Sequence, residues 1–305
     1  MKSVLITGVN GFVGHHLAKE LHNAGYRVHG IGGHIGSSAQ PPFVDIYTTL
    51  DLADSGTVET VDFSGVDAVI HLAGLAAVAP SFDEPMRYIN INIGIQVNLF
   101  EAAIAQGASP KFLIISSGSL YDPKTTFPIT EMSPVDPSSP YAVSKLGQEQ
   151  MAQYYAQRGF ECIIARPFNH IGPGQGPGFI VPDLAQQIVS GETVKVGNLD
   201  SERDYTDVRD IARAYRLLLE AGQAGQIYNV CSGAPVSGHK ILEGLQKAAE
   251  SSAPIEQDPS RMRPADNPVI YGSHDKLTAD TGWQPEISLD TTLADVIADW
   301  RSQST

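Results

Sequence analysis

TGVNGFVG at residues 7–14 decides the fold, because it joins an apolar run, SVLIT at residues 3–7, to an amphipathic segment at residues 12–24. Glycines at positions 8, 11 and 14 allow a tight turn, a close approach of the backbone to a diphosphate, and close packing of a helix on a strand. The start of that helix offers free N–H groups to an anion. Glycine-rich turns also occur as plain connections, but the place of this one after the first strand favours a dinucleotide site.

Strand-like and helix-like segments alternate over the first half of the chain. The expected strands are residues 3–7, 27–31, 43–47, 68–72, 112–115 and 161–165, and the expected helices are residues 12–24, 83–106 and 141–158. The run at residues 112–115 is continuously apolar, as in a strand covered on both faces. This alternation predicts an α/β fold with a Rossmann-type, doubly wound parallel sheet.

The character of the sequence changes after residue 166. The segment PFNHIGPGQGPG, residues 167–178, contains four glycines and three prolines, which predicts a loop and a boundary between lobes. We expect an NAD(P)-binding domain over residues 1–166, with residues 207–230 packing back on it, and a smaller substrate-binding lobe formed mainly by residues 167–305. Further helices are expected near residues 182–190, 208–221, 238–250 and 291–301, and strands near 193–196 and 226–230.

Composition argues against several classes of protein. The formal net charge of −14 opposes binding to nucleic acid or to an anionic membrane surface. No apolar run reaches the roughly 18 residues that span a bilayer, and we expect no secretory leader and a cytoplasmic location. Cys162 and Cys231 lack CxxC spacing and are expected to be buried free thiols, and the nine histidines lack zinc-site spacing, so we expect no metal.

The end of the second expected strand bears on the choice of cofactor. An Asp or Glu at this position would hydrogen-bond the adenosine ribose of NAD. The chain reads VHGIGGHIG here, with Gly32 at the expected position and no acid nearby. Because an acid would repel a 2′-phosphate, its absence permits NADP(H), which we take as the preferred cofactor, with NAD(H) possible. His34 either approaches that phosphate or is an ordinary loop histidine.

A second constellation is Tyr141-Ala-Val-Ser-Lys145, with Ser117 lying 24 residues before the tyrosine. Residues four apart share one face of a helix, so the Tyr141 hydroxyl and the Lys145 ammonium are expected to be neighbours. A nearby cation favours phenolate and predicts a lowered pKa for Tyr141, which would then exchange a proton with a carbinol or carbonyl oxygen. Ser117 follows an apolar strand, at the edge where doubly wound folds bind ligands.

Together these segments resemble the extended short-chain dehydrogenase/reductases that act on nucleotide sugars. The resemblance covers essentially the whole chain. It rests on TGVNGFVG, on DLAD at residues 51–54, HLAG at 71–74 and SSGSLY at 116–121, and on YAVSK and RPFNHIGPGQ. Residues 196–211, 228–233, 258–264 and 272–287 are similar to the members that reduce a GDP-sugar ketone. The resemblance also implies a homodimer.

The resemblance implies roles for individual residues. Ser117, Tyr141 and Lys145 would be catalytic. The cofactor would be held by Gly8, Asn10, Gly11, Phe12, Val13, Gly14, His34, Asp51, Leu52, Leu72, Ala73 and Gly74, together with Tyr141 and Lys145. The nucleotide sugar would be bound by Ser117, Asn169, Val196, Asn198, Arg203 and Arg263. The two arginines suit bidentate contact with phosphate, although without the resemblance a surface ion pair is the simpler interpretation.

The implied activity is NAD(P)H-dependent reduction of the C4 ketone of GDP-4-keto-6-deoxy-D-mannose to GDP-D-rhamnose. A nucleotide-sugar 4-epimerase and a cofactor-sensing protein without catalysis remain alternatives. A GDP-mannose 4,6-dehydratase is disfavoured, because Ser119 stands where the dehydratases carry a carboxylic acid. Two further departures, Asp122 in place of the usual glycine and a shifted motif around Asn92, indicate reshaping near the substrate.

Overall fold

The computed structural model describes residues 2–33, 40–261 and 267–303, so His34 and Arg263 lie outside the described residues. Its main element is a seven-stranded parallel sheet in the order β10-β6-β5-β4-β1-β2-β3. The strands are β1 (Ser3–Thr7), β2 (Arg27–Gly32), β3 (Ile46–Thr49), β4 (Ala68–His71), β5 (Lys111–Ile115), β6 (Cys162–Pro167) and β10 (Ile227–Val230). This confirms the predicted Rossmann-type α/β fold.

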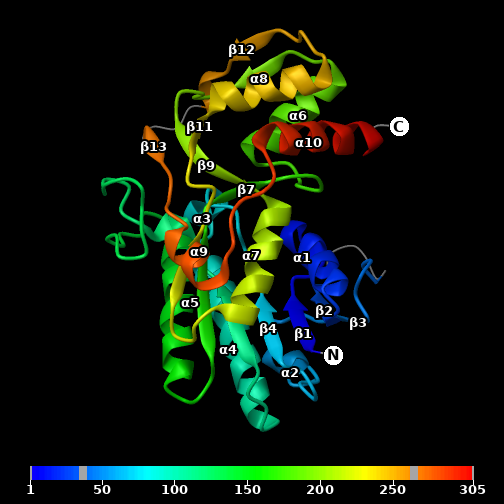
Figure 1. The fold of residues 1–305 in the computed structure, drawn as a ribbon, viewed down its shortest axis with the longest axis vertical. Coiled ribbons are helices and arrows are strands. Elements are labelled where there is room, and N and C mark those ends of the chain that lie inside the picture. The colour runs from blue at the N-terminus through cyan, green and yellow to red at the C-terminus, as the bar shows by residue number, and fades with distance from the viewer. Residues whose placement is uncertain (1, 34–39, 262–266, 304–305) are drawn as a thin grey trace.

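Helices cover both faces of this sheet (Figure 1). The helices of this part are α1 (Phe12–Asn23), α2 (Ser55–Val58), α3 (Pro80–Asp83), α4 (Pro85–Ala105), α5 (Pro140–Ala156), α7 (Val208–Ala221) and α9 (Asp275–Thr281). Helices α1 and α7 share one apolar cluster with the sheet, and α4 and α5 share a second. Strands β1, β4 and β6 are buried at every position, as expected for strands packed between two helical layers.

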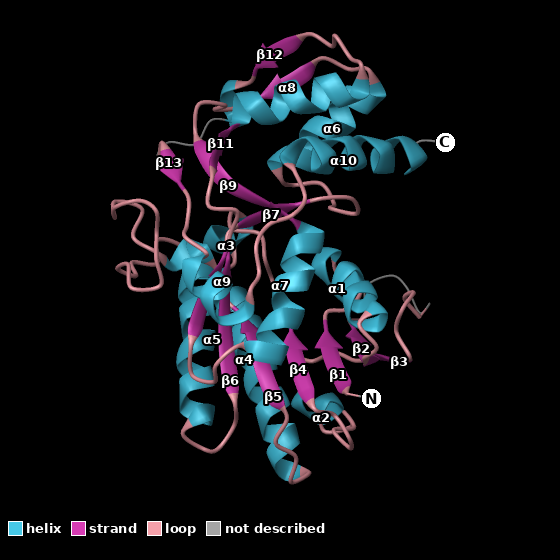
Figure 2. Cartoon of the chain, in the orientation of Figure 1, coloured by secondary structure: helices cyan, strands magenta, loops and turns pink. Residues whose placement is uncertain are grey.

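A second group of elements lies beyond the carboxyl ends of the parallel strands (Figure 2). Its strands are β7 (Asn169–Ile171), β8 (Val194–Val196), β9 (Glu202–Asp207), β11 (Pro235–Ser237), β12 (Ile255–Gln257) and β13 (Val269–Ile270), and its helices are α6 (Ile180–Ser190), α8 (Gly238–Ala249) and α10 (Leu289–Gln303). The three helices bury a separate apolar cluster. Strand β9 pairs with β7, β11 and β13.

Buried carboxylates fasten the second group to the first. Asp204 in β9 is fully buried, and it accepts hydrogen bonds from the backbone of Ser232, Gly233 and Gly272 and from the Ser232 hydroxyl, at 2.7 to 3.4 Å. Asp207, which caps α7, accepts a 2.7 Å bond from the Thr292 hydroxyl of α10. Segments far apart in sequence therefore meet at β9.

Several boundaries differ from the sequence expectations. The strand expected at residues 43–47 was placed too early: β3 begins at Ile46, and Phe43 has a φ of +66°, outside the extended region. The helix expected at residues 83–106 is divided, with α3 ending before Pro85 and α4 beginning there. Residues 167–178 are not one loop, because Asn169–Ile171 pairs with β9 as strand β7.

Candidate active site

The turn after β1 forms a cradle with no room for a side chain at Gly8 or Gly14 and little room for one at Gly11. Gly8 has a φ of +73°, and a Cβ there would lie 2.9 Å from the backbone nitrogen of Ala73. A Cβ on Gly14 would lie 2.5 Å from the carbonyl oxygen of Gly8, and one on Gly11 would lie 3.1 Å from that same oxygen. No side chain of these three glycines covers the backbone where α1 begins, so a diphosphate could contact the backbone N–H groups there. Phe12 and Val13 begin α1 directly after this turn.

At the end of β2, a side chain on Gly32 would meet the side-chain oxygen of Asn10 and would lie 2.5 Å from the Tyr47 hydroxyl, so these groups would have to move to admit the acid that holds an NAD ribose. Asn10 Nδ2 donates a 3.0 Å hydrogen bond to that hydroxyl, while Asn10 Oδ1 is buried with no hydrogen-bond partner among the described residues. Neutral polar groups therefore occupy this corner, and an unpaired amide oxygen remains for a ligand that hydrogen-bonds to it.

The loops after β3 and β4 are each fixed by hydrogen bonds. Leu52 is buried, and its carbonyl accepts a 3.0 Å bond from Asn98 Nδ2 of α4, while Asp51 Oδ1 accepts the Ala53 N–H at 3.0 Å. The segment Leu72, Ala73 and Gly74 follows β4, and the Ala73 N–H donates to Thr7 Oγ1 at 3.2 Å. Hydrogen bonds therefore hold both loops in place, and the loop after β4 lies against the glycine cradle, because a Cβ on Gly8 would meet the Ala73 backbone.

Helix α5 and the end of β5 bring Ser117, Tyr141 and Lys145 together. The Ser139 hydroxyl caps α5 by accepting the Ala142 N–H, so Tyr141 lies in the first turn and Lys145 one turn later. The Ser117 hydroxyl lies near the Tyr141 hydroxyl and acts to lower the pKa of that phenol. Lys145 Nζ lies 6.0 Å from the centroid of the Tyr141 ring and donates a 2.8 Å bond to the Ile115 carbonyl. Both Tyr141 and Lys145 are 8% exposed.

The electrostatics of this group correct one expectation. The sequence predicted a lowered pKa for Tyr141, but burial raises that pKa, and the hydrogen bond from Ser117 offsets only part of the rise. Removing the phenol from water disfavours the phenolate. Burial also lowers the pKa of Lys145 to about 8, against an opposing effect of Glu149. Tyr141 therefore keeps its proton at neutral pH, as a proton donor must.

His71 at the end of β4 is a polar group that sequence reasoning noted only as part of a motif. It is 2% exposed, and its Nδ1 lies 2.8 Å from Thr7 Oγ1. Burial lowers its pKa to about 3, with the charge of Lys145 as a smaller cause, so the ring is neutral at physiological pH. Its Nε2 has no hydrogen-bond partner among the described residues.

A buried ion pair beneath the site was missed by sequence reasoning. Arg166 of β6 makes two hydrogen bonds, at 2.8 and 2.7 Å, to Glu149 of α5, and both side chains are under 5% exposed. The Ser116 hydroxyl donates to Glu149 at 2.6 Å, and the guanidinium lies 4.8 Å from the Tyr121 ring centroid. The sequence does show Glu149 one helical turn after Lys145, but it gives no sign that the partner of Glu149 is Arg166 on strand β6.

Asn92 joins the loop after β4 to the catalytic helix. This fully buried side chain of α4 accepts the Leu75 N–H at 2.7 Å and donates to the Leu75 carbonyl at 3.1 Å and to Ser144 Oγ at 2.9 Å. Ser144 in turn donates to the Tyr141 carbonyl at 2.7 Å. The sequence marked Asn92 only as a departure from a motif, whereas the structure gives it three hydrogen bonds beside the site.

The expected sugar-binding residues lie in the second group of elements. Asn169 is exposed at the start of β7, which pairs with the strand that carries Arg203. Arg203 donates bonds of 2.8 Å to the carbonyls of Glu202 and Asn267. Val196 is buried at the end of β8, and Asn198 Oδ1 accepts the Asp200 N–H at 3.0 Å. These four residues therefore belong to the smaller lobe, whereas Tyr141 belongs to the parallel-sheet part.

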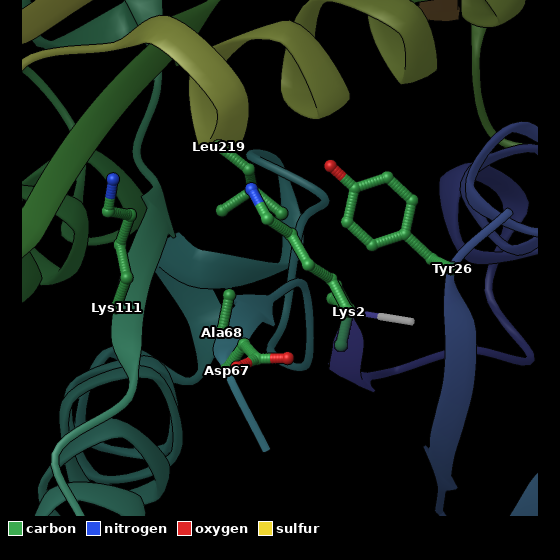
Figure 3. Close-up of a pocket in the computed structure, with 7 residues that line it drawn as sticks. Lys2, Tyr26, Asp67, Ala68, Lys111 and Leu219 are labelled. Carbon is green, nitrogen blue, oxygen red and sulfur yellow. The ribbon is translucent and has the colours of Figure 1, made fainter. Parts of the chain in front are cut away.

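Two cavities lie away from the Ser117–Tyr141 pair. A small one of about 110 Å³ is at the opposite, amino end of the parallel strands, where Lys2 extends toward Leu219 (Figure 3). A larger one of about 580 Å³ adjoins the outer side of α1, between His15, Phe43 and Arg209. Neither is lined by any of the predicted site residues that the structure describes.

Within residues 2–33, 40–261 and 267–303, no three His, Cys, Asp or Glu side chains are grouped to hold a metal ion. In the same ranges, no helix is long and apolar enough to cross a membrane. Cys162 and Cys231 are buried free thiols, as the sequence predicted.

The sequence matches a protein-family model and a known enzyme over most of its length. The model of the NAD dependent epimerase/dehydratase family matches residues 4–231. GDP-6-deoxy-D-mannose reductase of Pseudomonas aeruginosa is 37% identical to the chain over 98% of its length and 97% of that protein.

Solved structures agree with the sequence match. The structure of RMD from Pseudomonas aeruginosa complexed with NADPH is 36% identical, with a TM-score of 0.85 over 99% of this chain and 100% of that one. UDP-glucose 4-epimerase of Thermus thermophilus in complex with NAD is 28% identical, with a TM-score of 0.89 over 98% of this chain and 99% of that one. The chain therefore belongs to the NAD dependent epimerase/dehydratase family.

Proposed function

We propose that the chain reduces the C4 ketone of GDP-4-keto-6-deoxy-D-mannose to GDP-D-rhamnose, with NADPH as the preferred reductant. One observation carries the proposal: the buried Tyr141 lies close enough to Ser117 for the serine hydroxyl to lower its pKa, and the Ser117 hydroxyl is 2.9 Å from that of a neutral residue, Ser119. A proton donor is therefore present for a ketone oxygen, and no carboxyl group of residue 119 is available to expel a hydroxyl as water. The full-length similarity to GDP-6-deoxy-D-mannose reductase supports the same substrate.

The chain's own side chains supply the proton and the stabilisation of charge. A bound reduced nicotinamide supplies the hydride. Tyr141 donates its phenolic proton to the former ketone oxygen, Ser117 donates a hydrogen bond to that oxygen, and solvent later returns a proton to Tyr141. Lys145 fixes α5 against β5 and places a positive charge near the phenolate that remains.

The cofactor proposal rests on the glycine cradle and on the corner at Gly32. The Gly8–Gly14 turn would hold the diphosphate, Asp51 and Leu52 the adenine, and the segment 72–74 the nicotinamide side. Among the described residues, the neutral side chains of Asn10 and Tyr47 lie beside Gly32, and neither would repel a 2′-phosphate. The NADPH complex of RMD supports this preference, and the NAD complex of the epimerase is why NADH stays a candidate.

For the nucleotide sugar, we propose that Arg203 and Arg263 pair with phosphate, that Asn169 binds the diphosphate side, and that Val196 and Asn198 receive the base. The parallel-sheet part would bind the cofactor, and the smaller lobe would bind the sugar nucleotide.

A homodimer is proposed through the outer faces of α4 and α5, where Met86, Val143 and Tyr154 are exposed. Light scattering of the purified chain tests the dimer.

A 4-epimerase is the second candidate, favoured by the similarity to UDP-glucose 4-epimerases. The two activities differ in cofactor turnover, because an epimerase regenerates its cofactor. Mixing the protein with NADPH and GDP-4-keto-6-deoxy-D-mannose, and following NADPH absorbance, separates them. Stoichiometric NADPH oxidation supports the reductase. No oxidation, together with interconversion of 4-epimers by the protein as purified, would replace it with the epimerase.

A further inference from the structure

The chain turns sharply after Ser117, and this turn brings a second hydroxyl to it. Strand β5 ends at Ile115, and a 3-10 turn, η1, covers Gly118–Leu120. Gly118 packs so closely on the Phe168 ring that a Cβ would lie 3.0 Å from it. The Ser119 N–H donates to Ser117 Oγ at 3.1 Å, and the two serine Oγ atoms are 2.9 Å apart.

The direction of that Oγ–Oγ bond decides what Ser117 can do. A hydroxyl has one hydrogen and two lone pairs. One lone pair of Ser117 Oγ accepts the Ser119 N–H. If the Ser119 hydroxyl donates to the second lone pair, the Ser117 hydrogen is left for Tyr141 or for an oxygen bound beside it. If Ser117 donates to Ser119 instead, that hydrogen is used up.

We propose that Ser119 is a positioning residue that donates its hydroxyl hydrogen to Ser117 and so directs the Ser117 hydrogen toward Tyr141 and the reacting oxygen. The inference rests on the proposed reduction for its catalytic meaning, but the bond itself does not need a substrate. It also explains why a neutral side chain suits residue 119: a carboxylate there would accept the Ser117 hydrogen and reverse the bond.

A spectroscopic experiment tests the hydrogen bond in the free protein. With ¹³C-labelled tyrosine, the Cζ chemical shift of Tyr141, assigned by its absence in Tyr141→Phe, reports the hydrogen bond that the phenol receives. Ser119→Ala should move this shift toward its value in Ser117→Ala, and Ser119→Thr, which keeps a hydroxyl, should leave it near wild type. Residue 119 is exposed, so these variants keep the fold.

The double variant shows whether residue 119 acts through Ser117. In the Ser117→Ala background, adding Ser119→Ala should change neither the Tyr141 shift nor the rate. In the wild-type background, Ser119→Ala should lower kcat by about fivefold, the effect of one hydrogen bond of about 1 kcal/mol. The affinity for NADPH should be unchanged, and Ser119→Asp should be slower than Ser119→Ala.

Two results would overturn the proposal: a Tyr141 shift in Ser119→Ala equal to wild type, or an effect of Ser119→Ala that persists without the Ser117 hydroxyl. A wild-type protein that oxidises no NADPH with the keto-sugar, while the shifts behave as expected, would refute the proposed function and leave the positioning role standing.

Discussion

Lys145 Nζ donates a 2.8 Å hydrogen bond to the carbonyl oxygen of Ile115, so the catalytic helix is fastened to the end of the central strand β5. The ammonium group is buried and lies 6.0 Å from the centroid of the Tyr141 ring. It is therefore close to the phenol, but its hydrogen bond goes to the Ile115 carbonyl. The pKa of this buried amine depends on the groups around it. The carboxylate of Glu149 favours the charged form, and the nearby ring of His71 is neutral.

The pH dependence of the reduction should follow Lys145. Burial lowers its pKa to about 8, so the ammonium is present below that pH and lost above it. We expect kcat/KM to fall as pH rises through about 8, and Lys145→Met to lower kcat/KM by about a hundredfold at pH 7 and to remove this step. A pH–rate profile that stays flat to about pH 10, the usual pKa of lysine, would contradict the role of Lys145.

Removing the Glu149 carboxylate should destabilise the fold strongly. Glu149→Gln leaves the buried guanidinium of Arg166 without a counter-charge, and we expect a loss of about 3 kcal/mol in the free energy of unfolding. Urea denaturation measures it. Glu84→Gln, which breaks the exposed pair with Arg87, is the matched control and should leave the urea midpoint near that of the unmodified protein. Equal losses for the two variants would refute this distinction.

Asn92 should contribute more to the free energy of unfolding than Asn90, an exposed residue of the same helix. Asn92→Ala removes three hydrogen bonds and leaves the Leu75 N–H unpaired, so we expect a loss of about 2–3 kcal/mol in unfolding free energy. Asn90→Ala, at an exposed position of α4, should change it by less than about 0.5 kcal/mol. If denaturation gives the same midpoint for both, the bonds of Asn92 contribute little.

The glycine cradle predicts a selective loss of cofactor binding. Gly14→Ala would place a Cβ 2.5 Å from the Gly8 carbonyl oxygen, so the turn must distort, and we expect NADPH affinity to fall by at least about tenfold. In Gly94→Ala, the new Cβ on α4 has open space around it, and helix propensity should add about 0.5–1 kcal/mol of stability. Fluorescence titration with NADPH measures the affinity, and an unchanged value for Gly14→Ala would argue against the cradle.

The fold was predictable where the pattern is local. The glycine turn belongs to one strand–turn–helix unit, and the step from Tyr141 to Lys145 belongs to one helix. The structure confirms both: α1 begins directly after the turn, and Tyr141 and Lys145 are neighbours on α5. Strand β9 was missed because its sequence, ERDYTD, looks like a solvated loop. Asp204 is buried there with donors from residues 232, 233 and 272, and Asp207 accepts from the distant Thr292 as well as from Arg209 nearby. The Glu149–Arg166 pair escaped prediction for the same reason.

Transfer of deuterium from the cofactor tests the central claim most directly. The protein should be incubated with GDP-4-keto-6-deoxy-D-mannose and NADPH deuterated at the transferable position of the nicotinamide, and the product examined by NMR and mass spectrometry. We predict GDP-D-rhamnose that carries one deuterium at C4, formed in proportion to the NADPH consumed, and no product from Tyr141→Phe. A product without deuterium at C4, or unchanged substrate with NADPH intact, would contradict the account.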